Sequence, residues 1–145
     1  VPTTTKGDGN LNYEAIRFSD ILLVEAEALN EAGQSAAALV PLNKVRKRAR
    51  ESYLYDNTLP GFGAVPSGLL PDITTTDQTQ LRTIIRQERR SELGLEFHRF
   101  FDMIRYGKTY ASQAMNDVPN FNYDQDQFFP IPQSERDTNQ KLGLK

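Results

Sequence analysis

The sequence predicts an all-α fold: a tetratricopeptide-like helical hairpin, two further helices, long irregular loops and an extended C-terminal tail. Two observations support this prediction. Apolar residues recur at helical spacing in four segments, and a glycine, Gly33 or Gly107, follows directly where such a segment ends. Residues 1–145 are of a length that fits a single domain, or a fragment of a longer protein.

Composition narrows the class of protein. The chain is 38% hydrophobic and 25% charged, which indicates a globular protein. Its net charge of -2 argues against a protein built to hold nucleic acid. The absence of cysteine excludes disulfides and thiolate metal sites, and no apolar run is long enough to span a membrane. Because no signal peptide is present and the chain opens on Val1, we expect a mature product, domain or fragment of something longer.

The helical hairpin is predicted over residues 13–51, after an irregular leader at 1–12. Its first helix, residues 13–32, carries apolar side chains on two sides. Such a helix lies between two neighbours, or has a neighbour that this chain does not supply. The size of the hairpin is near that of a tetratricopeptide unit.

The second helix of the hairpin is expected at 36–51, with Ser35 as its N-cap. Pro41 removes one backbone hydrogen bond and should kink this helix. A basic cluster follows Pro41. We interpret this cluster as a solvated helix face with one or two arginines reaching Glu27 or Glu31, rather than as a nucleic-acid surface. Its members are Lys44, Arg46, Lys47, Arg48 and Arg50.

Residues 52–76 form a long predicted loop rich in proline, glycine and threonine. Loops of this length are usually functional or disordered. Three aromatic residues lie in it: Tyr53, Tyr55 and Phe62. They are the candidate ligand-binding residues, because their rings could stack on a ligand, although they could equally fasten the loop to the body of the protein.

Two helices are predicted within 77–107, and Asp77 offers an N-cap to the first. On that helix, Leu81, Ile84, Ile85 and Leu95 form an apolar side that also includes Glu88 and Glu92. These carboxylates could be an acid–base pair, as in a glycosidase. We favour structural ion pairs with nearby arginines, because an unpaired buried charge is costly and no catalytic motif accompanies the two.

The second helix of this region places Phe97, Phe100, Phe101 and Ile104 on one face. His98, the single histidine, flanks this face and is expected to be structural, because zinc sites usually need several histidines. No catalytic residue, metal site or cofactor is predicted. Residues 108–145 are expected to form an irregular tail in which the prolines of Phe129-Pro130-Ile131-Pro132 impose an extended course.

Four segments, in this order, resemble the SusD/RagB family of nutrient-binding proteins. Together they cover most of the chain from Tyr13 to Asn139. The first ends in AEALNE, the second reads LNKVRKRA, the third runs from LRTIIRQERRSEL to RFFDMIRYG, and the last is FPIPQSE followed by an asparagine. They occupy Tyr13–Glu31, Leu42–Ala49, Leu81–Gly107 and Phe129–Glu135 with Asn139. Tyr106 stands where the family often has Trp, and Phe97 where it commonly has Gly.

The resemblance implies a non-enzymatic protein, of which this chain would be the C-terminal portion without the N-terminal part. Family members are lipid-anchored on the surface of the outer membrane of Bacteroidetes. They capture glycans or other nutrients and pass them to a SusC-like TonB-dependent transporter. This chain would supply mainly scaffold and docking surface. The alternative is a tetratricopeptide-like interaction module without sugar binding.

Recurrent charged positions of the family are also matched in this chain. We interpret them as a buried ion-pair network that holds the scaffold together. They are Glu27, Glu88, Arg89, Glu92, Arg99 and Asp102.

Overall fold

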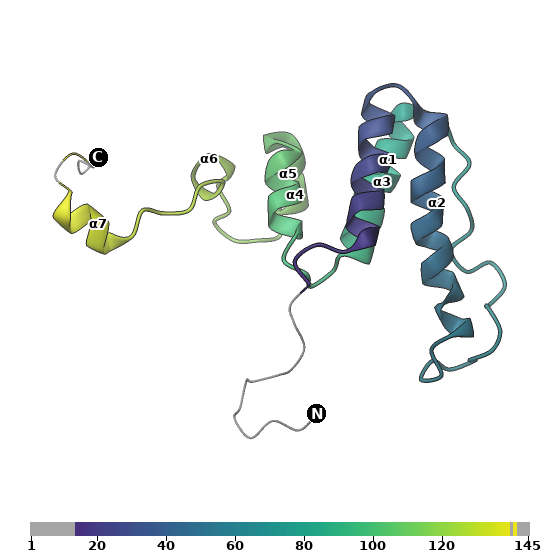
Figure 1. Cartoon of the computed structure of the whole chain (residues 1–145). Helices are drawn as coiled ribbons and strands as arrows, with labels where there is room; N and C mark the ends of the chain where they lie inside the picture. Colours follow the sequence, from purple (N-terminus) through teal and green to yellow (C-terminus); the bar gives the residue numbers. More distant parts are fainter. Residues whose placement is uncertain (1–13, 140, 142–145) are drawn as a thin grey trace, which may run out of the picture. The chain divides into compact units, whose positions relative to one another are not determined.

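The computed structural model describes residues 14–139 and 141, and it divides the chain into two compact units, Val1–Phe97 and His98–Lys145. The described residues form helices and no strand, so the all-α prediction is confirmed (Figure 1). No helix among them is long and apolar enough to cross a membrane. The expected leader at 1–12 lies outside the described residues. The elements are α1 (Phe18–Glu31), α2 (Ser35–Glu51), the 3-10 turn η1 (Ser52–Leu54), α3 (Gln78–Glu92), α4 (Arg99–Arg105), α5 (Lys108–Ala114), α6 (Tyr123–Asp126) and α7 (Gln133–Thr138).

In the first unit, α1 is the central helix. It packs against both α2 and α3, whereas α2 and α3 touch each other only sparsely (Figure 1). The two neighbours cover only part of the apolar surface of α1, because Leu22, Leu23 and Ala26 are buried whereas Phe18 and Ile21 are exposed. The core consists of small and aliphatic side chains, and fully burying a large one contributes about 1.5–3 kcal/mol. Its members are Leu22, Leu23, Ala26, Ala38, Leu42, Val45, Leu81 and Ile85.

A tight turn at Gly33 joins α1 to α2. The backbone amide of Gln34 donates to the carbonyl of Leu29 (2.8 Å), and the amide of Gly33 donates to the carbonyl of Asn30 (3.0 Å). These two bonds satisfy carbonyls at the end of α1 in a Schellman pattern. The pattern requires a positive φ, which is +76° at Gly33 and is disfavoured for residues with a side chain.

The starts of the two hairpin helices differ from the expectation. Helix α1 begins at Phe18 rather than at residue 13, because Arg17 has an extended backbone. Helix α2 begins at Ser35 itself, so Ser35 is not its N-cap. The Ser35 hydroxyl instead donates to Oδ1 of the buried Asn30 (2.8 Å). Helix α2 continues through Pro41, which is buried, and the expected kink stays a prediction.

Polar side chains of α2 fasten the long loop at its C-terminal end. Asn43 exchanges two hydrogen bonds with the backbone of Ile73, at 2.8 and 2.9 Å. Arg46 donates to the carbonyl of Pro71 through Nε (3.1 Å) and Nη2 (3.0 Å). Arg50 donates to the carbonyl of Leu70 (3.0 Å). Part of the basic cluster therefore anchors the loop rather than facing solvent.

Helix α3 starts as predicted and ends earlier than predicted. The Asp77 carboxylate accepts a hydrogen bond from the backbone amide of Gln80 (2.7 Å), which makes it the N-cap. The helix ends at Glu92, and Leu95 follows with a positive φ of 67°. Leu95 is 100% exposed, so its assignment to the apolar side of this helix was wrong. The turn moves its side chain out of helical phase.

In the second unit, α4 packs against α5, and Asp102, Met103 and Ala111 are buried. Phe101 is exposed, so the four residues expected on one apolar face do not share a buried environment. The stretch 108–145 also contains three short helices, α5, α6 and α7, where an irregular tail was expected. Each is only one or two turns long, too short to show a clear apolar period in the sequence.

Asn30 joins three elements of the first unit, and we expect Asn30→Ala to destabilise it. Its side chain is fully buried, donates to the carbonyl of Gln78 (3.0 Å) and accepts from Ser35. Substitution leaves both partners unsatisfied, which should lower the free energy of unfolding by about 1–3 kcal/mol. Chemical denaturation measures this loss. The exposed Gln34→Ala is the control, with an expected change within about 0.5 kcal/mol. Equal effects of the two substitutions would contradict the prediction.

Candidate functional site

A buried ion pair links α2 to α3. Arg46 Nη1 and Glu88 Oε2 are 2.5 Å apart, and both residues are buried. Glu88 therefore has the arginine partner that its place among apolar residues required. The partner comes from the basic cluster of α2, whereas the sequence analysis expected Glu27 or Glu31 to receive arginines of that cluster. Glu31 pairs instead with Arg82 of α3, at 2.5 Å.

Glu92, at the C-terminal end of α3, is shared by two arginines. Arg17 Nη1 lies 2.6 Å from Glu92 Oε1, and Arg48 Nη1 lies 3.4 Å from the same oxygen. Arg17 also pairs with Glu96 through Nε, at 2.8 Å. The hydrogen bond to Glu96, together with the charge of Glu92, raises the pKa of Arg17 above its usual range. The Glu92 carboxylate at the end of α3 thus connects this helix to Arg17, which precedes α1, and to Arg48 of α2.

A third pair joins α1 to α3. Arg89 Nη1 is 2.8 Å from Asp20 Oδ1, and both residues are buried. Asp20 was not among the predicted network residues, because an acidic residue in the first turn of a helix is common on account of the helix dipole and does not by itself indicate a buried partner. Neither Glu88 nor Glu92 lines the clefts described below.

The remaining predicted network residues lie elsewhere. Glu27 is half-buried on α1. Arg99 and Asp102 belong to the second unit, where Arg99 donates to the Tyr110 hydroxyl (3.2 Å) and Asp102 accepts from Arg105 (3.1 Å). The structure brings Glu88, Arg89 and Glu92 into paired contacts across the first unit. That the six residues act together to hold the scaffold stays a prediction.

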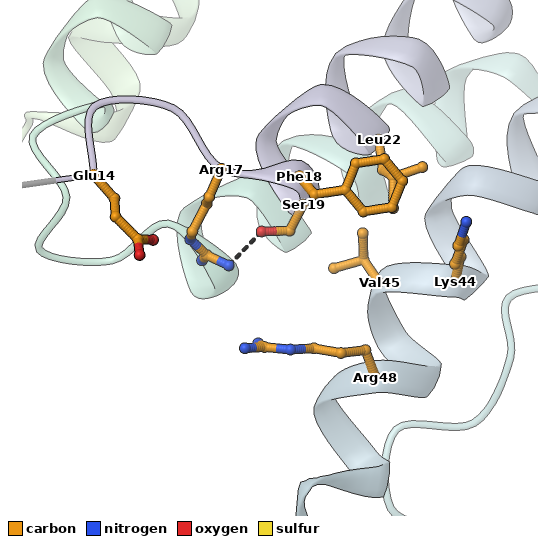
Figure 2. A pocket seen from close by; sticks show the side chains of 8 residues that line it. All are labelled: Glu14, Arg17, Phe18, Ser19, Leu22, Lys44, Val45 and Arg48. Atoms are coloured by element: carbon orange, nitrogen blue, oxygen red, sulfur yellow. Dashed lines mark hydrogen bonds between the residues drawn. The ribbon is translucent and has the colours of Figure 1, made fainter.

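The first cleft lies between α1 and α2 and has a volume of about 320 Å³ (Figure 2). Leu22 and Val45 give it an apolar base, and Phe18 adds an aromatic ring. Lys44 Nζ lies 4.9 Å from the centre of that ring, within the range of a cation–π interaction. The lining residues are Glu14, Arg17, Phe18, Ser19, Leu22, Lys44, Val45 and Arg48.

The second cleft is a more open space of about 650 Å³ at the end of α2. Tyr55 lines it and is 79% exposed, and Asp56 and Asn57 contribute polar groups. The Thr58 hydroxyl and amide donate to the Asp56 carboxylate and hold its pKa below the usual value. Arg48 lines both clefts.

Of the three predicted ligand-binding aromatics, Tyr55 alone is among the residues that line these clefts. Tyr53 is half-buried, and its carbonyl accepts from the Gly63 amide (2.8 Å). The sequence analysis missed Phe18, Lys44 and Arg48 as cleft residues. Their signal was available, because Lys44 and Arg48 are one helical turn apart and point to the same side of α2. Within the described part of the chain, no cluster of three potential ligands could hold a metal ion.

The ion pair of Arg46 and Glu88 should be strongly coupled. Glu88→Ala should lower the free energy of unfolding by about 3–5 kcal/mol, because it leaves a buried guanidinium without its counter-charge. Denaturation of both single variants and of Arg46→Ala/Glu88→Ala gives the coupling energy. Arg82→Ala, also on α3, removes the more exposed pair with Glu31 of α1 and should cost no more than about 1 kcal/mol. Strictly additive single effects would argue against the coupling.

Comparison with known proteins adds the evolutionary context of this arrangement. The chain matches the SusD family over residues 2–143. SusD-like protein P2 of Formosa agariphila is 32% identical over 139 residues, which cover 93% of this chain and 25% of that protein. SusD-like protein P38 of the same organism is 35% identical over 114 residues, covering 78% of this chain and 20% of that protein. No solved structure matches the chain.

The chain thus spans about a quarter or less of the length of these curated relatives. The matched residues nevertheless span the helices α1, α2 and α3. Because the family match covers nearly all of its residues, the chain belongs to the SusD family.

Proposed function

We propose that this chain is part of a non-enzymatic nutrient-capture protein at the bacterial cell surface. The protein binds glycans and delivers them to a SusC-like TonB-dependent transporter in the outer membrane. A lipid anchor elsewhere in the polypeptide holds it there. Membership of the SusD family over residues 2–143 is the observation that carries this proposal.

Uncovered apolar side chains support a scaffold and docking role for much of the chain. On α1, Ile21 and Val24 are each about half exposed, and Val40 of α2 is 72% exposed. Contiguous exposed apolar surface typically marks a protein–protein contact. Further protein surface, from the same polypeptide or from the transporter, would bury these side chains.

The charged residues support binding without catalysis. A general acid–base pair needs two titratable groups that converge on a substrate space. Glu88 and Glu92 instead face Arg46 and Arg17, and neither lines one of the two clefts. Their arrangement favours a structural role over hydrolysis.

The full-length protein that contains these residues should bind oligosaccharides without converting them. A glycan array identifies the ligands, and isothermal titration then measures their affinity. Chromatography of the bound saccharide should recover it unchanged, with no new reducing ends. Release of shorter products would contradict the non-enzymatic proposal. Binding of peptides and of no saccharide would instead favour the tetratricopeptide-like interaction module.

Docking on the transporter should depend on the uncovered side of α1. We expect Ile21→Glu/Val24→Glu to weaken co-purification with the co-expressed TonB-dependent transporter, because the substitutions place charges where apolar surface would be buried. Glu25→Gln, an exposed change on the same helix, is the matched control. Circular dichroism verifies that each variant is folded. Undiminished co-purification of a folded double variant would place the docking surface elsewhere.

A further inference from the structure

We infer that the first cleft binds a negatively charged unit of a saccharide, carrying a carboxylate or a sulfate, through Lys44 and Arg48. This inference rests on the proposed function and names a ligand class and a site for it.

Lys44 is the first of the two cations. It is exposed, lines the cleft and forms no ion pair within the described part of the chain. Its ammonium group is positioned 4.9 Å from the centre of the Phe18 ring. An ammonium group has three donors, and the face of one ring does not use them all. A ligand anion in the cleft would supply the missing acceptor.

Arg48 is the second cation and is only weakly engaged. Its side chain is 72% exposed, and its contact with Glu92 is long, at 3.4 Å. Glu92 is already bound at 2.6 Å by Arg17, which in turn pairs with Glu96. A guanidinium has five N–H donors in a planar fork that suits carboxylate and sulfate oxygens. Arg48 therefore retains donors for a ligand.

The balance of charge in the cleft favours an anion. The lining carries three cations and one carboxylate, Glu14. Glu92 and Glu96, outside the lining, pair with Arg17, and Glu92 also contacts Arg48, so Lys44 is the lining cation with which no described carboxylate pairs. Complementary charge of this kind gives a binding site specificity and attracts the oppositely charged ligand.

The base of the cleft suits a sugar ring rather than a bare ion. Leu22, Val45 and Phe18 present carbon atoms beside the two cations (Figure 2). A charged sugar combines an apolar C–H face with an anionic group, so it can contact both parts of the lining. The volume of about 320 Å³ is at the lower end of small-molecule sites, which indicates a small unit of the saccharide.

The second cleft offers room for the neighbouring unit of the same saccharide. Arg48 lines both clefts, and Tyr55 is the aromatic residue on the far side of it. Lys44 and Arg48 share a side of α2, one helical turn apart, and Tyr55 follows directly after η1. A chain of sugars could thus extend from the cations to the Tyr55 ring.

Titration of the complete gene product with three oligosaccharides of equal length tests the inference. The probes are an oligogalacturonate, a sulfated oligogalactose and a neutral oligogalactose. At least one charged probe should bind on the order of tenfold more tightly than the neutral one. The variant Lys44→Ala/Arg48→Ala should remove this preference, and it should also weaken the dependence of affinity on salt.

The control variant is Lys47→Ala/Arg90→Ala, which removes the same total charge from exposed positions outside both clefts. It should keep the preference for the charged probe. Lys44→Gln tests Lys44 alone and leaves the Arg48–Glu92 contact intact, so a loss of preference there cannot arise from misfolding of that contact.

Two outcomes would overturn the inference while the proposed function stands. One is saccharide binding with no preference for charge, and the other is a preference that the Lys44 and Arg48 variants leave unchanged. Failure to bind any saccharide on a wider array would contradict the proposed function itself. The carboxylated and sulfated probes, compared with each other, identify which anionic group the cleft accepts.

Discussion

The structure of the first unit depends on buried ion pairs that join a carboxylate of one helix to an arginine of another. Because α1 lies between α2 and α3, those two helices share little apolar contact, and charged pairs connect them instead. Arg46 reaches Glu88 from α2, and Asp20 of α1 receives Arg89. Buried pairs of this kind add little net stability over apolar residues, but breaking one is costly, so they fix the relative positions of the helices. The relative positions of the helices in turn determine where the side chains that line the first cleft lie.

The first cleft follows from the same pairs. Glu92 holds Arg17 close and Arg48 at a longer distance, so the arginine from α2 stays at the rim. The basic side chains of α2 therefore point to two different sides of the helix. Arg46 and Arg50 point to the long loop and bind its carbonyls, whereas Lys44 and Arg48 line the cleft. The division follows from helical geometry, because residues four apart share a face and residues two apart do not.

Local signals in the sequence predicted which segments are helical better than they predicted the tertiary contacts of individual side chains. Helical periodicity, the stop at Gly33 and the Asp77 cap all correspond to observed features. Glu88, set among apolar residues, predicted that an arginine would be found, but its partner Arg46 lies 42 residues away, and tertiary packing selects it. The ends of helices were less predictable. Ser35 has the ordinary chemistry of an N-cap, yet its hydroxyl binds the buried Asn30, since tertiary burial outweighs the local preference. Of the second cleft, the sequence predicted only that aromatic residues such as Tyr55 lie in a long loop.

The overall charge of the chain does not reveal the cations that line the first cleft. The chain has 17 basic and 19 acidic residues, and an average of that kind suggests no preference for anions. Most of the arginines discussed above are neutralised by specific carboxylates or bound to loop carbonyls, and such neutralised cations cannot attract a ligand. What determines binding is the local remainder, the cations that packing leaves without a counter-charge beside an accessible apolar surface. Among the described residues that line the first cleft, this remainder is Lys44 together with the loosely held Arg48, and only the three-dimensional arrangement separates them from Arg46 and Arg50 on the same helix.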